Sequence, residues 1–143
     1  MKSISKLGCI FCLLIISGCF GGDGEKIETA AFSGTVTLDG QPLEKGVIQF
    51  RPGKDASGQP LRGQITEAAI NAGQYQLASD QGAVVGENSV VISATKVVGK
   101  EMADGVEIEK VEQYLPAKYN SETTLTITVT PEDTEHNFEL SSK

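Results

Sequence analysis

The chain has no tryptophan, a single histidine and only three cysteines among its 143 residues. Zinc sites take their ligands from sets of histidine and cysteine. Because His136 is the sole imidazole and no cysteine follows Cys19, we expect no such metal site and no disulfide beyond that point. No Gly-x-Ser-x-Gly turn marks a hydrolase nucleophile, and residues 82–86 lack the Lys-Ser/Thr pair of a phosphate loop. The sequence therefore predicts no catalytic residues and no cofactor.

Long hydrophobic runs are also scarce. The longest covers residues 7–16, is interrupted only by Gly8, and follows the positive residues Lys2 and Lys6. A helix needs about 20 residues to cross the hydrocarbon core of a bilayer, so this run is too short to span one. A basic start followed by a short apolar run is typical of a secretory signal peptide, which we place at residues 1–18.

The signal peptide is expected to end in a lipid attachment site. Residues Ile16-Ser17-Gly18-Cys19 resemble a bacterial lipobox, in which cleavage precedes an acylated cysteine. Two or more acyl chains hold a protein firmly on a membrane, so lipid is the expected partner of Cys19. Phe20 follows the cysteine, which resembles the outer-membrane sorting state of Gram-negative lipoproteins. We expect a chain that is secreted across the inner membrane and lipid-anchored to the outer membrane, on its periplasmic or cell-surface face.

A plain secretory peptide, with Cys19 as a bystander, is the alternative for this segment. An ordinary signal-peptidase site has small residues at positions −3 and −1. Gly18 fits the second position, but Ile16 at −3 is large and branched. The lipobox interpretation is therefore preferred.

Basic residues are too few for a nucleic-acid-binding protein. The chain has 12 Lys and Arg against 19 Asp and Glu, a formal net charge of −7. Without Lys2 and Lys6 the balance is 12 − 2 = 10 against 19, or −9. Affinity for nucleic acid depends largely on Lys and Arg, and docking on anionic lipid needs a basic patch. Neither is expected here, and the negative charge is interpreted as favouring solubility.

The remaining chain divides into a tether and one domain. Residues 19–31 are rich in glycine and charge and lack periodicity, which predicts a flexible lipidated tether. Residues 32–141 then show short runs of period-two alternation separated by turn signals such as Asp39-Gly40. The expected strands cover residues 32–38, 46–50, 64–70, 74–77, 88–97, 124–130 and 136–140. This pattern predicts an all-β fold, a single antiparallel β-sandwich of about seven strands with immunoglobulin-like architecture.

An acidic segment at residues 98–113 interrupts this pattern. We interpret it as an exposed excursion between two core strands, containing a short edge strand or a turn of helix. Its glutamates, and a second acidic cluster at residues 132–135, do not match the spaced ligands of a twelve-residue calcium loop. Solvated surface is the expected role of both.

Several segments together resemble a known family. They are residues 32–43 (FSGTVTLDGQPL), 46–52 (GVIQFRP), 73–77 (GQYQL), 115–120 (LPAKYN), 124–129 and 137–140 (NFEL). In this order they resemble the carboxypeptidase-regulatory-like, or transthyretin-like, lipoproteins of planctomycete bacteria. The resemblance covers residues 32–140 and implies a prealbumin-like sandwich without established catalytic residues. The related hydroxyisourate hydrolases end in Tyr-Arg-Gly-Ser and use several histidines, which this chain lacks, so their activity is not expected.

Two tyrosines are candidate contact residues. Tyr114 is the better candidate for an exposed aromatic contact. Tyr119 lies in the Pro116-to-Asn120 segment, where a plug at the end of the sandwich, as in a tyrosine corner, is the preferred interpretation and a surface contact is the alternative. A strand-end histidine such as His136 is more often structural than catalytic.

The expected function is that of a membrane-anchored lipoprotein whose non-catalytic β-sandwich has a structural or binding role at the cell envelope. One alternative is a surface module that binds a carbohydrate or protein ligand, with an envelope protein or glycan as partner. A second alternative is a hydrolase that uses His136.

Overall fold

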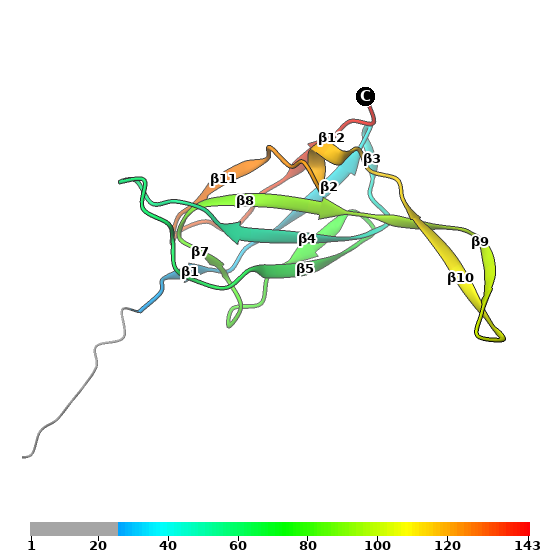
Figure 1. The fold of residues 1–143 in the computed structure, drawn as a ribbon. Coiled ribbons are helices and arrows are strands. Elements are labelled where there is room, and N and C mark those ends of the chain that lie inside the picture. Colours follow the sequence, from blue (N-terminus) through cyan, green and yellow to red (C-terminus); the bar gives the residue numbers. More distant parts are fainter. Residues whose placement is uncertain (1–25) are drawn as a thin grey trace, which may run out of the picture.

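The computed structural model describes residues 26–143, which form an almost entirely β structure (Figure 1). Its strands are β1 (Thr29–Ala30), β2 (Ser33–Leu38), β3 (Gln41–Pro42), β4 (Lys45–Pro52), β5 (Thr66–Asn71), β6 (Gln74–Gln76), β7 (Ala83–Val84), β8 (Gly86–Ser93), β9 (Thr95–Ala103), β10 (Val106–Gln113), β11 (Thr126–Val129) and β12 (Phe138–Leu140). A single 3-10 turn, η1 (Ala117–Tyr119), completes the described elements.

Seven strands form one curled sheet in the order β11-β8-β4-β5-β6-β2-β12, with β3 added to β2. Neighbouring strands in this order are antiparallel, except for β12, which pairs with β2 in parallel. The sheet curls so that β4, β5 and β8 face β2, β6 and β12 across one core (Figure 1). The predicted all-β antiparallel sandwich is confirmed, with one parallel pair that the sequence pattern did not predict.

The core follows from the alternation of side chains along each strand. In β4, Ile48 and Phe50 have no exposed surface, whereas Val47, which precedes them on the opposite face of the strand, is 39% exposed. Phe50 lies at the centre, where its ring centroid is 6.0 Å from that of Tyr75 in β6 and 6.4 Å from that of Phe138 in β12. These aromatic contacts join the two layers of the sandwich.

Three two-residue turns set the register of three hairpins. Their central residues all have positive φ: Asp39 (50°) and Gly40 (81°), Ala72 (50°) and Gly73 (76°), Asp104 (51°) and Gly105 (81°). Positive φ at both positions is the type I′ conformation, whose twist matches the right-handed twist of the flanking strands. The turn predicted at Asp39-Gly40 is confirmed.

The end of the chain closes the sandwich against β2. A Cβ added to Gly34 would lie 1.7 Å from the carbonyl oxygen of His136, so only glycine permits this approach. The Asn137 side chain continues the contact, because its Oδ1 accepts bonds from the backbone N–H and the hydroxyl of Thr35 at 2.7 and 2.8 Å. Phe138 then pairs with Val36 as β12 begins.

Two predicted boundaries need correction. The tether was expected to extend to residue 31, but Thr29 and Ala30 form β1, which pairs with β7, and Ala30 is buried. The ordered domain therefore begins before residue 32. The segment at residues 98–113 is neither a short edge strand nor a turn of helix, because it is most of a long hairpin, β9–β10. Its predicted exposure is correct.

Replacing Ile48 with alanine should destabilise the domain by about 2–5 kcal/mol, because the side chain is fully buried and its loss leaves a cavity. The matched control is Val47→Ala on the outer face of the same strand, which should cost less than about 1 kcal/mol. Equilibrium denaturation with urea measures both. Equal losses for the two variants would contradict the described orientation of β4.

Candidate functional site

The two candidate tyrosines occupy different environments. Tyr119 in η1 is only 8% exposed, and its hydroxyl oxygen accepts a hydrogen bond from the backbone N–H of Ser141 at 2.9 Å. The neighbouring Asn120 donates to the carbonyl oxygens of Leu115 and Pro116 at 3.3 and 3.0 Å. Tyr119 is therefore not available as a surface contact: the segment folds inward, and its ring has the preferred role of a plug.

Tyr114 lies at the base of the β9–β10 hairpin and is partly buried against the core. Its backbone N–H donates to the carbonyl of Ala94 at 3.2 Å, and Lys96 Nζ lies 6.0 Å from the ring centroid. Partial burial, and then the negative charge of Glu44, raise the pKa of the Tyr114 hydroxyl. The phenol is therefore neutral at physiological pH and available as a hydrogen-bonding aromatic contact.

His136 is held by structural contacts. Its ring lies edge-on to Phe32, with centroids 4.7 Å apart, and its Nε2 is 3.0 Å from an Asp133 carboxylate oxygen. Asp133 also accepts bonds from the backbone N–H and hydroxyl of Thr130, at 2.7 and 3.0 Å. Within residues 26–143, the hydrogen bonds of the His136 ring involve Asp133 alone. The arrangement orients a turn before β12.

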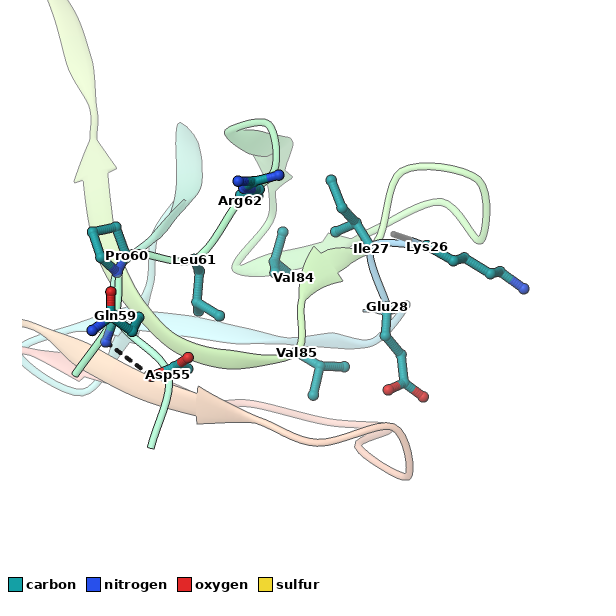
Figure 2. A pocket seen from close by; sticks show the side chains of 10 residues that line it. All are labelled: Lys26, Ile27, Glu28, Asp55, Gln59, Pro60, Leu61, Arg62, Val84 and Val85. Carbon is teal, nitrogen blue, oxygen red and sulfur yellow. Dashed lines mark hydrogen bonds between the residues drawn. The ribbon is translucent and has the colours of Figure 1, made fainter. Parts of the chain in front are cut away.

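An open pocket of roughly 640 Å³ lies at the end of the sandwich where residue 26 joins it (Figure 2). Its walls come from the entering chain, the loop after β4, and the β7 region: Lys26, Ile27, Glu28, Asp55, Gln59, Pro60, Leu61, Arg62, Val84 and Val85. Two cationic and two anionic side chains balance one another in this lining. The pocket combines an apolar wall with a neutral sum of charges.

Asp55 in this pocket shapes its own loop. Its carboxylate accepts hydrogen bonds from the hydroxyl and backbone N–H of Ser57, at 2.7 and 2.8 Å, and from the backbone N–H of Gln59 at 2.9 Å. These bonds, led by the one from the Ser57 hydroxyl, lower the pKa of Asp55. Because the Asp55 carboxylate accepts three hydrogen bonds from its own loop, it stabilises a turn and is poorly placed to act as an acid or base.

The β9–β10 hairpin is the most exposed element of the described chain. It projects from the sandwich at the end opposite β1 (Figure 1). Among residues 26–143, nine large apolar side chains are exposed, and six of them lie on this hairpin: Val97, Val98, Met102, Val106, Ile108 and Val111. Sequence reasoning identified the segment as exposed but not its apolar surface. The overlooked signal was Asp104-Gly105, a type I′ turn sequence between two alternating runs.

Two features are absent from the described part of the chain. No cluster of three His, Cys, Asp or Glu side chains suitable for a metal ion occurs within residues 26–143. In the same range, no helix is long and apolar enough to cross a membrane. Cys19 and the whole predicted signal peptide lie outside the described residues.

Comparisons with protein-family models, curated proteins and solved structures find no match to this chain. The structure therefore defines the protein at the level of fold. It is an all-β sandwich with a plugged end, a small open pocket beside the entering chain and a projecting apolar hairpin.

The Asp133 carboxylate should contribute to acid stability. The backbone bond from Thr130, followed by the bond to His136, lowers the pKa of Asp133 below its ordinary value of 3.8. A lowered folded-state pKa gives stability that is present above the unfolded-state pKa and is lost as the pH falls through the folded-state pKa. Asp133→Asn should therefore lose less stability than the wild type between about pH 5 and about pH 2. Thermal melts across this range measure the effect.

The control is Glu132→Gln, an exposed neighbour whose pH profile should follow the wild type. If the stability of Asp133→Asn fell as steeply with pH as that of the wild type, the proposed contribution of Asp133 to acid stability would be contradicted.

Proposed function

We propose that this chain is a bacterial lipoprotein, anchored by acylated Cys19, whose non-catalytic β-sandwich has a binding role at the cell envelope. The observation that carries the anchor is the sequence Ile16-Ser17-Gly18-Cys19 directly after the apolar run of residues 7–16. An aliphatic residue, two small residues and a cysteine at that place fit lipid attachment. The resemblance of residues 32–140 to transthyretin-like lipoproteins supports the same role.

The position of the first described residues suits a tethered domain. Cys19 and Lys26 are 26 − 19 = 7 residues apart, a stretch that spans at most about 25 Å when fully extended. An acylated Cys19 would keep the pocket end of the sandwich close to the lipid surface. The β9–β10 hairpin, at the opposite end, would then point away from the membrane (Figure 1).

A binding role accounts for the exposed apolar hairpin better than catalysis does. Single apolar residues are common on protein surfaces, but six on one projecting ribbon support the proposal that this ribbon contacts a partner. His136, in contrast, is bonded to Asp133 and packed against Phe32, which supports a structural role. The proposed function therefore places the contact surface on the hairpin and assigns no chemistry to the histidine.

Cys19→Ser should move the protein from the membrane fraction to the soluble fraction and abolish labelling by a radioactive or clickable fatty acid, because the thioether cannot form. Cys12→Ala, within the apolar run, is the matched control and should retain both the label and the membrane association. Mass spectrometry of the wild-type N-terminus should identify residue 19 with its acyl chains. A Cys19→Ser protein that stays membrane-bound would refute the lipoprotein proposal.

A further inference from the structure

The β9–β10 hairpin is a two-stranded ribbon with both faces in solvent. All residues of β10 are exposed, and β9 has one partly buried residue, Ala103. Within the described chain these two strands form a sheet of their own. An isolated two-stranded ribbon is marginally stable in water, and a third strand or a packing layer stabilises it. The ribbon is therefore an incomplete sheet.

Each face of the ribbon carries both apolar and acidic side chains. Val106 and Ile108 share one face with Glu101, which is paired with Ile108. Glu107, Glu109 and Val111 lie on the other face. Carboxylates on both faces make burial in hydrocarbon costly, so a lipid bilayer is a poor occupant.

The two edges of the ribbon differ. Along β9 a register shift leaves Val98 as an extra residue between Val97 and Gly99, and lysines stand on either side at Lys96 and Lys100. Bulges and lysines are features that keep other strands from adding to an edge. The extra residue lies in β9, so β10 presents eight consecutive residues without an insertion. The accessible edge is therefore that of β10.

The existing partner of β10 shows which side chains complement it. Glu112 is paired with Lys96, Val111 with Val97, and Glu109 with Lys100. Lys100 also reaches diagonally to Glu107, with Nζ 2.5 Å from a carboxylate oxygen. Opposite-charge and aliphatic cross-strand pairs each stabilise an antiparallel ladder. A strand on the free side of β10 would meet the same side chains and needs the same chemistry.

We propose that the free edge of β10 binds an extended segment of another envelope protein, one that alternates basic and aliphatic side chains and adds to the hairpin as a third, antiparallel strand. Backbone hydrogen bonds supply affinity in strand addition, and alternate side chains supply specificity. Lysine or arginine opposite Glu107 and Glu109 pairs with their charges, and aliphatic residues opposite Val106 and Ile108 cover exposed apolar surface. The proposal rests on the proposed binding role.

A second copy of this chain fits the edge less well. β10 has three glutamates and one lysine, so each copy of the strand carries a net charge of −2, and this opposes the pairing of two copies. The whole protein also has a formal net charge of −7, which opposes close approach of two copies. Charge complementarity therefore favours a basic partner.

The test is a titration of the purified full-length chain, labelled with ¹⁵N, with the peptide Thr-Lys-Val-Glu-Lys-Val-Lys-Val. Run antiparallel, its lysines face Glu112, Glu109 and Glu107, and its glutamate faces Lys110. Binding with Kd below about 1 mM is expected, with amide shifts confined to the hairpin. The control peptide exchanges every lysine and glutamate and should bind at least about tenfold more weakly.

The double variant Glu107→Lys/Glu109→Lys should lose at least about tenfold in affinity for the first peptide. Glu132→Lys/Glu139→Lys makes the same change in net charge at exposed positions elsewhere and should leave the affinity unchanged. Equal weakening in both double variants would show unspecific charge attraction and overturn the proposal. Shifts centred on the sheet edges β11 or β12 would also overturn it.

Two other outcomes separate this proposal from its alternatives. Concentration-dependent dimers that disappear in the Glu107→Lys/Glu109→Lys variant would assign the edge to a second copy and overturn the proposal. Failure of the peptide to bind, together with normal acylation of Cys19, would reject the strand-addition site and leave the lipoprotein assignment standing.

Discussion

Closure of the curled sheet around Phe50 is the constraint on which the rest of this structure depends. The Phe50 ring packs edge-on against Phe32, with centroids 5.2 Å apart, and also contacts Tyr75 and Phe138. These partners come from the start, the middle and the end of the described chain, so one cluster joins segments that lie far apart in sequence. Aromatic pairs add to the free energy that burial of their area already supplies. Because the cluster fixes the two layers against each other, it also fixes where the loops, the pocket and the hairpin emerge.

Periodicity predicted the strands that have one buried face. Ile48 and Phe50 are fully buried as the alternation in β4 indicates, whereas in β8 Val91 is buried together with Val90 and Ile92 on either side of it. The pattern failed where burial does not alternate. Strands β1 and β7 contain two residues each, too few to show a period, and Ala83 and Val84 are both buried. The parallel placement of β12 beside β2 depends on the approach of Gly34 to the His136 carbonyl, which no local pattern encodes.

The candidate site was less predictable than the fold, because exposed and functional residues do not follow a regular sequence pattern as buried strand residues do. Tyr119 and Tyr114 are five residues apart, yet the first is buried in η1 and the second is only partly buried. In the hairpin, glutamates and lysines interleave with valines, so the segment has the composition of solvated surface although it forms two long strands. Asp104-Gly105 was the local signal that could have distinguished a ribbon from a loop.

The parallel strand β12 has a consequence for the order of folding. It pairs with β2 across a separation of 138 − 36 = 102 residues, so β2 lacks one neighbour until the last residues of the chain are available. Contacts between residues so distant in sequence slow folding, because a large loop must close before they form. The edge of β2 therefore stays unpaired while the intervening residues fold, and the addition of β12 is the step that completes the sandwich.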